Sequence, residues 1–145
     1  MTLLKSYYQL CKPNVVYMML ICAFVGMLLA EESVTSFGYL MVALLGIALC
    51  AASAAAINQV IDRNTDASMT RTDQRPLPQG ELSVSHASLF ALVVGILGAL
   101  VLYLYVNTLT MLLTLASLVG YAFIYTVYLK RATPQNIVIG GLAGA

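Results

Sequence analysis

The sequence from Ala51 to Gly80 reads AASAAAINQVIDRNTDASMTRTDQRPLPQG, and the rest of the chain is organised around it. It begins as an apolar run of small residues, suited to close helix packing, and becomes the most polar part of the chain. Asn58, Asp62 and Asp66 recur every four residues within it. At ~100° per residue, such positions fall on one face of a helix. The pattern therefore predicts a helix whose end carries one carboxamide and two carboxylates on a shared face.

This polar face is a candidate site for Mg²⁺. The ion prefers oxygen ligands, keeps several waters, and takes one or two carboxylates together with substrate phosphates. Acidic residues at helical spacing are also typical of a solvated surface. However, like charges at this spacing destabilise a helix, and ionisable groups beside a membrane helix are by default functional. We therefore predict that Asn58, Asp62 and Asp66 hold the metal, directly or through water.

Basic residues follow the polar face. The segment TRTDQRP contains Arg71 and Arg75, whose guanidinium groups can bind a phosphate as a bidentate fork. Two prolines and a glycine exclude a regular helix over residues 71–80. We therefore expect both arginines to lie in a loop beside the end of the polar helix.

Composition indicates the class of protein. Hydrophobic residues make up 61% of the chain and charged residues 9%, and the mean hydropathy is +0.89. A soluble domain carries ~25% charged residues, so this chain cannot cover its surface with charge. We predict an all-α integral membrane protein, a multi-helix transmembrane bundle forming one membrane domain over residues 1–145. The net charge of +1, without a basic patch, gives no sign of nucleic-acid binding.

Four membrane spans and the start of a fifth are predicted. They cover residues 15–30, 37–60, 88–106 and 109–129, with the fifth beginning at 137–145. The helix of the second span is expected to continue to Asp66. The run from residue 137 to 145 is too short to cross a bilayer, which needs ~20 residues. We therefore expect the membrane domain to be incomplete at its carboxyl end.

Cysteine, histidine and glycine positions are interpreted as structural. The cysteines at 11, 22 and 50 have no metal-ligand spacing and are read as unpaired thiols. His86 stands just inside a predicted helix start, capped by Ser83 or Ser85, where a capping or interfacial role is more typical than a ligand role. Gly95 and Gly98 are expected to be helix-packing contacts, since no strand precedes them.

The polar face and the residues after it resemble a family motif. Asn58, Asp62 and Asp66, continued by Met69, Arg71-Thr72 and Arg75-Pro76-Leu77, resemble the first aspartate-rich motif of UbiA-type intramembrane prenyltransferases. The stretch YTVYLKRATPQNIVIGGLAGA at 125–145 is similar to the haem-modifying branch of that family, and so are the phrases KPNVV and GMLLA. The resemblance implies a bundle of about nine helices, all backbone groups being paired within lipid, with a second aspartate-rich motif that this chain lacks.

The resemblance also implies a reaction. That branch transfers a farnesyl group from farnesyl diphosphate to the vinyl group of haem b (protoheme IX), which gives haem O for haem-copper terminal oxidases. It assigns the catalytic and metal-binding roles to Asn58, Asp62 and Asp66, and diphosphate binding to Arg71, Arg75 and Lys130. Mg²⁺ would stabilise the leaving diphosphate, and an apolar chamber would keep water from the allylic cation. Residues 1–145 alone are expected to be inactive.

Other functions remain open at this point. One is a sister UbiA-type prenyltransferase that acts on an aromatic or quinone precursor. A different class is a membrane transporter fragment whose aspartates coordinate a transported cation, although the acidic pair lies beside arginines rather than at mid-bilayer. A third is a non-catalytic fragment. Expected partners are membrane lipid, farnesyl diphosphate and haem b, with haem A synthase or terminal oxidase assembly factors as candidates.

Orientation follows from the basic residues. Threading the spans places all seven lysines and arginines on one side, whereas the opposite loops carry only Glu31 and Glu32. By the positive-inside rule the basic side is cytoplasmic. We therefore expect a multi-pass protein of the bacterial inner membrane whose polar face opens to the cytoplasm.

Reporter fusions test this topology. Fusions made after Glu32 and after Gly80 should give opposite signals, because the two positions lie on opposite sides of the membrane. A periplasmic signal at Gly80 would contradict both the topology and the orientation of the site.

Overall fold

The computed structural model describes residues 3–30, 36–70 and 72–129. Within these ranges every regular element is a helix, which confirms the predicted all-α class. The elements are α1 (Leu3–Leu10), α2 (Pro13–Leu29), α3 (Phe37–Ala67), α4 (Val84–Tyr105), α5 (Thr108–Val119) and the π-helical segment η1 (Gly120–Leu129).

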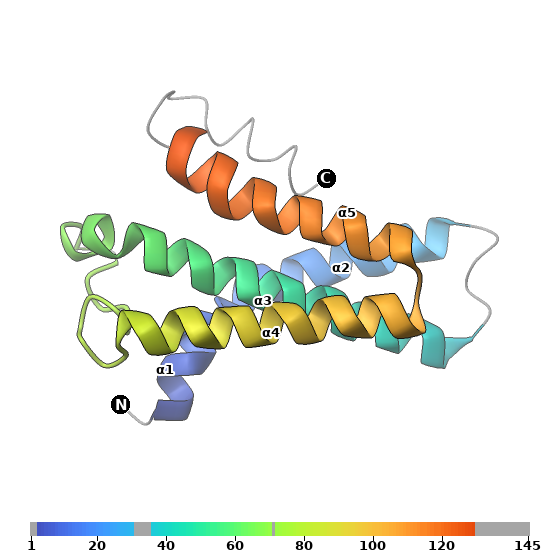
Figure 1. Ribbon diagram of the computed structural model, residues 1–145, viewed down its shortest axis with the longest axis horizontal. Coiled ribbons are helices and arrows are strands. Elements are labelled where there is room, and N and C mark those ends of the chain that lie inside the picture. The colour runs from blue at the N-terminus through green and yellow to red at the C-terminus, as the bar shows by residue number, and fades with distance from the viewer. Residues whose placement is uncertain (1–2, 31–35, 71, 130–145) are drawn as a thin grey trace.

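Helix α3 is the centre of the bundle. It contacts each of the other elements, and its most extensive contact is with α4, which runs beside it (Figure 1). The loop from α3 to α4 lies at one end of the bundle, and the turn from α4 to α5 lies at the other (Figure 1). Helix α1 reaches the loop end, where the Ser6 hydroxyl donates to the Glu81 carboxylate at 2.7 Å.

Three helix starts are fixed by capping side chains. Ser36 accepts from the backbone N–H of Tyr39 at 3.2 Å, and Ser83 accepts from that of His86 at 3.2 Å. Between α4 and α5, the Asn107 side chain accepts from the N–H of Thr110 at 2.7 Å. Each cap satisfies a donor that the first turn of a helix leaves without a partner. Of the two predicted caps for α4, the structure therefore selects Ser83.

Close packing of α3 on α4 depends on small residues. A Cβ atom placed on Gly98 would lie 2.9 Å from the backbone nitrogen of Cys50 and 2.9 Å from the Gly46 oxygen. One placed on Gly95 would lie 2.7 Å from the Ser53 hydroxyl oxygen, which itself donates to the Ala91 carbonyl at 2.7 Å. The predicted packing role of the two glycines is therefore confirmed.

The surface and the helix lengths are those of a membrane protein. Large apolar side chains stand exposed along α2, α4 and α5, as expected where lipid replaces water. Among the described residues, α3 and α4 are each long and apolar enough to cross a membrane. Helices α1 and α2 together, bent by 47°, would make a third span, and Thr108–Ile124 forms a shorter apolar helix.

Several helix bounds differ from the predicted spans. The first predicted span corresponds to α2, which already begins at Pro13, and α3 continues to Ala67. The region 109–129 is not one uniform α-helix, because it changes to π-helical geometry at Gly120. Whether each of these segments crosses the bilayer stays a prediction, and the expected fifth span at 137–145 lies outside the described residues.

A glycine substitution tests the α3–α4 contact. Replacing Gly98 with alanine should destabilise the protein by about 1–3 kcal/mol, because the new Cβ meets backbone atoms that cannot move aside. Gly26→Ala is the matched control, since no atom lies within 4 Å of its added Cβ. Thermal unfolding in detergent is the measurement. Equal midpoints for the two variants would contradict the close contact.

Candidate active site

Three side chains of the predicted site lie at the carboxyl end of α3. Asn58 is 3% exposed, Asp62 4% and Asp66 3%. The Asn58 amide donates to the Asp62 carboxylate at 3.2 Å, so these two share a face, as their spacing predicts. The alternative of a solvated helix surface is wrong, because all three side chains are buried.

The carboxylates stand at the electrostatically unfavourable end of their helix. The carboxyl end of a helix carries partial negative charge, which favours cations there. The last turn of α3 contains no basic residue. A cation from another element is therefore needed to compensate the buried aspartates.

Arg75 provides one such cation from the loop after α3. Its Nη1 lies 2.5 Å from the Asp66 Oδ2, with the arginine side chain 29% exposed and the aspartate 4%. The Thr72 hydroxyl donates to the Asp66 carbonyl at 3.0 Å, which holds the loop against the helix end. The predicted loop position of Arg75 beside the polar helix is therefore found. Arg75 is half-buried, with part of its guanidinium open to solvent.

Lys12 provides a second cation that sequence reasoning did not assign to the site. Its ammonium donates to the Asn58 side-chain oxygen, although the two residues are 46 positions apart. Lys12 stands between α1 and α2 with a left-handed backbone, φ 49°. From the sequence it is one more lysine of the basic side, and only its place directly before Pro13 marks a helix start.

Thr126 is the second residue that sequence reasoning missed. Its hydroxyl accepts from the Asn58 amide at 2.9 Å and donates to the Tyr121 carbonyl at 2.9 Å. Thr126 and Tyr121 both belong to the π-helical segment η1, a form often found at functional sites. No local pattern in the sequence indicates this geometry.

An apolar cavity borders the same region. It has a volume of about 250 Å³ and lies between α2, α3, α5 and η1. Ala54 and Ala51 line it, one and two turns before Asn58 along α3, and Tyr121 lines it from η1. The buried polar face of α3 therefore continues into an apolar chamber.

The remaining predicted residues are placed as follows. Arg71 and Lys130 lie outside the described residues. His86 is exposed in the first turn of α4. In the part of the chain that the structure describes, Cys11, Cys22 and Cys50 are unpaired. Within the same part, no group of three or more His, Cys, Asp or Glu side chains converges.

Known proteins match this chain closely. The family model described as the UbiA prenyltransferase family matches residues 19–145. Protoheme IX farnesyltransferase 2 of Pseudoalteromonas atlantica is 57% identical over 97% of this chain and 46% of its own length. The protoheme IX farnesyltransferases of Idiomarina loihiensis and Legionella pneumophila are 56% and 54% identical, over 47% and 48% of their lengths. The chain thus spans about half the length of these relatives. No solved structure matches it significantly.

A double-mutant cycle tests the ion pair at the helix end. Arg75→Met should lower the free energy of unfolding by about 1–3 kcal/mol, because it leaves the buried Asp66 carboxylate without its cation. Adding Asp66→Asn should recover part of that loss. Arg63→Met is the control, because it removes an exposed arginine of α3, the helix that carries Asp66. Thermal unfolding in detergent is the measurement, and additive effects of the two changes would contradict the pairing.

Proposed function

The chain belongs to the UbiA prenyltransferase family, and from that premise we propose that it transfers a farnesyl group from farnesyl diphosphate to haem b, giving haem O. The support from relatives is that protoheme IX farnesyltransferases are more than half identical to it over 97% of the chain. The observation that carries the proposal is the buried oxygen-rich face of α3, which has cations beside it and an apolar cavity below it.

We propose that the polar face holds Mg²⁺ through Asn58, Asp62 and Asp66. These residues supply only oxygen ligands, one carboxamide and two carboxylates, which is the donor set that Mg²⁺ prefers. Two side-chain cations already face this set, Lys12 at Asn58 and Arg75 at Asp66. When bound, Mg²⁺ would supply charge neutralisation for the departing diphosphate.

Arg75 is the proposed diphosphate-binding residue among the described side chains. Its guanidinium can bind two phosphate oxygens at once, and it keeps partial exposure while paired with Asp66. The pair with Asp66 holds it next to the metal ligands before substrate arrives. Arg71 and Lys130 remain candidates for the same role.

The cavity would hold the isoprenoid chain. Its walls on α3 are mostly small or apolar, with Ile47, Ala51 and Ala54 among them, and its polar lining consists of Cys50, Thr114, Ser117 and Tyr121. An apolar wall keeps water away from an allylic cation as the carbon–oxygen bond to diphosphate breaks. The vinyl group of haem b is then the proposed nucleophile, and water completes the hydroxyethylfarnesyl side chain of haem O.

The proposed setting is the bacterial inner membrane. The protein is an integral membrane protein by its helices and its family. We propose that the end of the bundle carrying the α3–α4 loop faces the cytoplasm, because Lys12 and Arg75 lie there among the described residues. Proposed partners are membrane lipid, farnesyl diphosphate and haem b. Haem A synthase or terminal oxidase assembly factors are further proposed partners.

The test uses the full-length protein in a bacterial strain without its own haem O synthase. Asp62→Asn and Asp66→Asn should each abolish haem O formation while the protein remains inserted, because the amide keeps the shape and loses the charge. Haem O is measured by mass in membrane extracts. Asp73→Asn, which changes a carboxylate of the neighbouring loop, is the control. Normal haem O yield from both site variants would rule out their proposed role.

Absence of haem O from the unmodified protein would overturn the proposal. Prenylated aromatic products in the same extracts would point to the sister prenyltransferase instead. Cation uptake into vesicles that depends on Asp62 would point to the transporter.

A further inference from the structure

Cys11 and Lys12 join α1 to α2, and we call this bend the elbow. It places the Lys12 side chain at the site. The two helices meet at a bend of 47°, and Lys12 adopts φ 49° and ψ 63° there. A left-handed conformation is uncommon for a residue other than glycine. It persists where surrounding contacts determine it, so the contacts around the elbow indicate what it is built to do.

Gln59 clamps the elbow to α3. Its side-chain nitrogen donates to the carbonyls of Gln9 and Leu10, each at 3.1 Å. These carbonyls belong to the last turn of α1, and the Gln9 carbonyl also accepts from the Lys12 backbone N–H at 3.1 Å. Gln59 is 2% exposed, so this is a buried contact between the centre of the bundle and the elbow.

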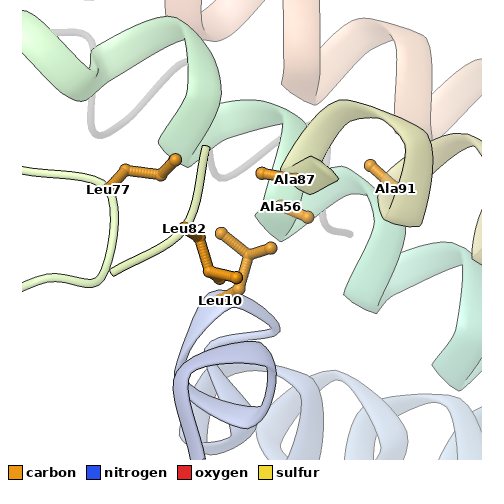
Figure 2. Packing of buried hydrophobic residues seen from close by; sticks show 6 residues of the cluster. All are labelled: Leu10, Ala56, Leu77, Leu82, Ala87 and Ala91. Atoms are coloured by element: carbon orange, nitrogen blue, oxygen red, sulfur yellow. The ribbon is translucent and has the colours of Figure 1, made fainter. Parts of the chain in front are cut away.

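Apolar packing holds the elbow from the other side. Leu10 is 0% exposed and belongs to a cluster with Ala56 of α3, Leu82 of the loop and Ala87 of α4. Figure 2 shows Leu10 at the end of α1, pointing toward Leu82 and Ala56. The elbow is therefore anchored to three other parts of the bundle, which fixes the starting point of the Lys12 side chain.

The anchored Lys12 meets a fixed acceptor. The Asn58 amide nitrogen donates to Asp62 and to Thr126, which turns the amide oxygen toward the Lys12 ammonium. An ammonium group can only donate, and a metal ion takes the same oxygen lone pairs. The amide oxygen has two lone pairs, but an ammonium group bonded to one of them repels a divalent cation that approaches the other, so Lys12 and the metal compete by charge at the Asn58 oxygen.

We propose that Lys12 is a positioned counter-cation that competes with the divalent metal for Asn58, and that Gln59 is the positioning residue which holds it there. This inference rests on the proposed metal site. The Lys12 ammonium compensates the buried carboxylates when the metal is absent, as Arg75 does at Asp66. Metal binding is then favoured when the ammonium moves away from the Asn58 oxygen. The affinity of the site for metal is thereby coupled to the conformation of the elbow between α1 and α2.

The competition predicts the sign of a mutational effect. Lys12→Met removes a cation that occupies a ligand oxygen and repels the incoming metal. The affinity for Mn²⁺, used as a spectroscopic substitute for Mg²⁺, should therefore rise about fivefold to tenfold without diphosphate, the scale of one like-charge contact at a partly buried site. A residue with a merely structural role would lower metal affinity or leave it unchanged.

The experiment measures Mn²⁺ binding by electron paramagnetic resonance, using the full-length protein in lipid nanodiscs without substrate. Lys12→Arg should bind Mn²⁺ like the unmodified protein, because it keeps the charge. Gln59→Met should raise the affinity less than Lys12→Met does, because it frees the elbow without removing the ammonium. Lys5→Met is the matched control, since Lys5 is an exposed lysine of helix α1, which precedes the elbow, and it should change nothing.

Opposite results separate this inference from the proposed function. Unchanged or weaker Mn²⁺ binding by Lys12→Met would overturn the competition and leave the metal site intact. An effect of Lys5→Met as large as that of Lys12→Met would also overturn it, since general surface charge would then be the cause. Failure of the unmodified protein to bind Mn²⁺ would overturn the proposed metal site itself, and the inference with it.

Discussion

Two carboxylates buried at the carboxyl end of a long helix are the constraint on which the rest of the site depends. Asp62 and Asp66 stand where the helix dipole already disfavours negative charge, and burial removes the water that would otherwise solvate them. Helix α3 supplies no cation in its last turn. The loop and the elbow that approach this helix end carry Arg75 and Lys12 to it.

The need for cations at the carboxyl end of α3 explains why segments far apart in the chain meet at one end of the bundle. The loop after α3 folds back through turns, with Thr72 bonded to the helix end and Leu77 and Leu82 packed beneath it. Helix α1 docks on the same loop through Ser6 and Leu10. Charge compensation and apolar packing thus act on the same segments. The segments that carry Arg75 and Lys12 are thus held by hydrogen bonds and apolar packing as well as by the bonds of the two cations to Asp66 and Asn58.

Different faces of α3 serve different purposes. One face uses Gly46, Cys50 and Ser53 to lie close against α4, whose glycines leave room for no larger side chain. Another face carries the apolar cavity and continues into the polar group at Asn58. The helix pair therefore supports a polar helix end with an apolar cavity beside it. The proposed substrate, with a diphosphate head and an isoprenoid tail, has the same division into a polar and an apolar part.

The sequence by itself determined the features that arise from local pattern. Composition gave the membrane class, four-residue spacing placed Asn58 and Asp62 on one face, and turn residues placed Arg75 in a loop. Capping at Ser83 and the packing glycines were also predictable, because each depends on neighbours in the chain or on residue size. The tertiary structure alone decided that this face is buried and that Lys12 and Thr126 bond to Asn58. These partners are 46 and 68 residues away, and they reach it through a left-handed elbow and a π-helical turn. Neither conformation has a periodic signature, because each is imposed by packing rather than by the preferences of its own residues.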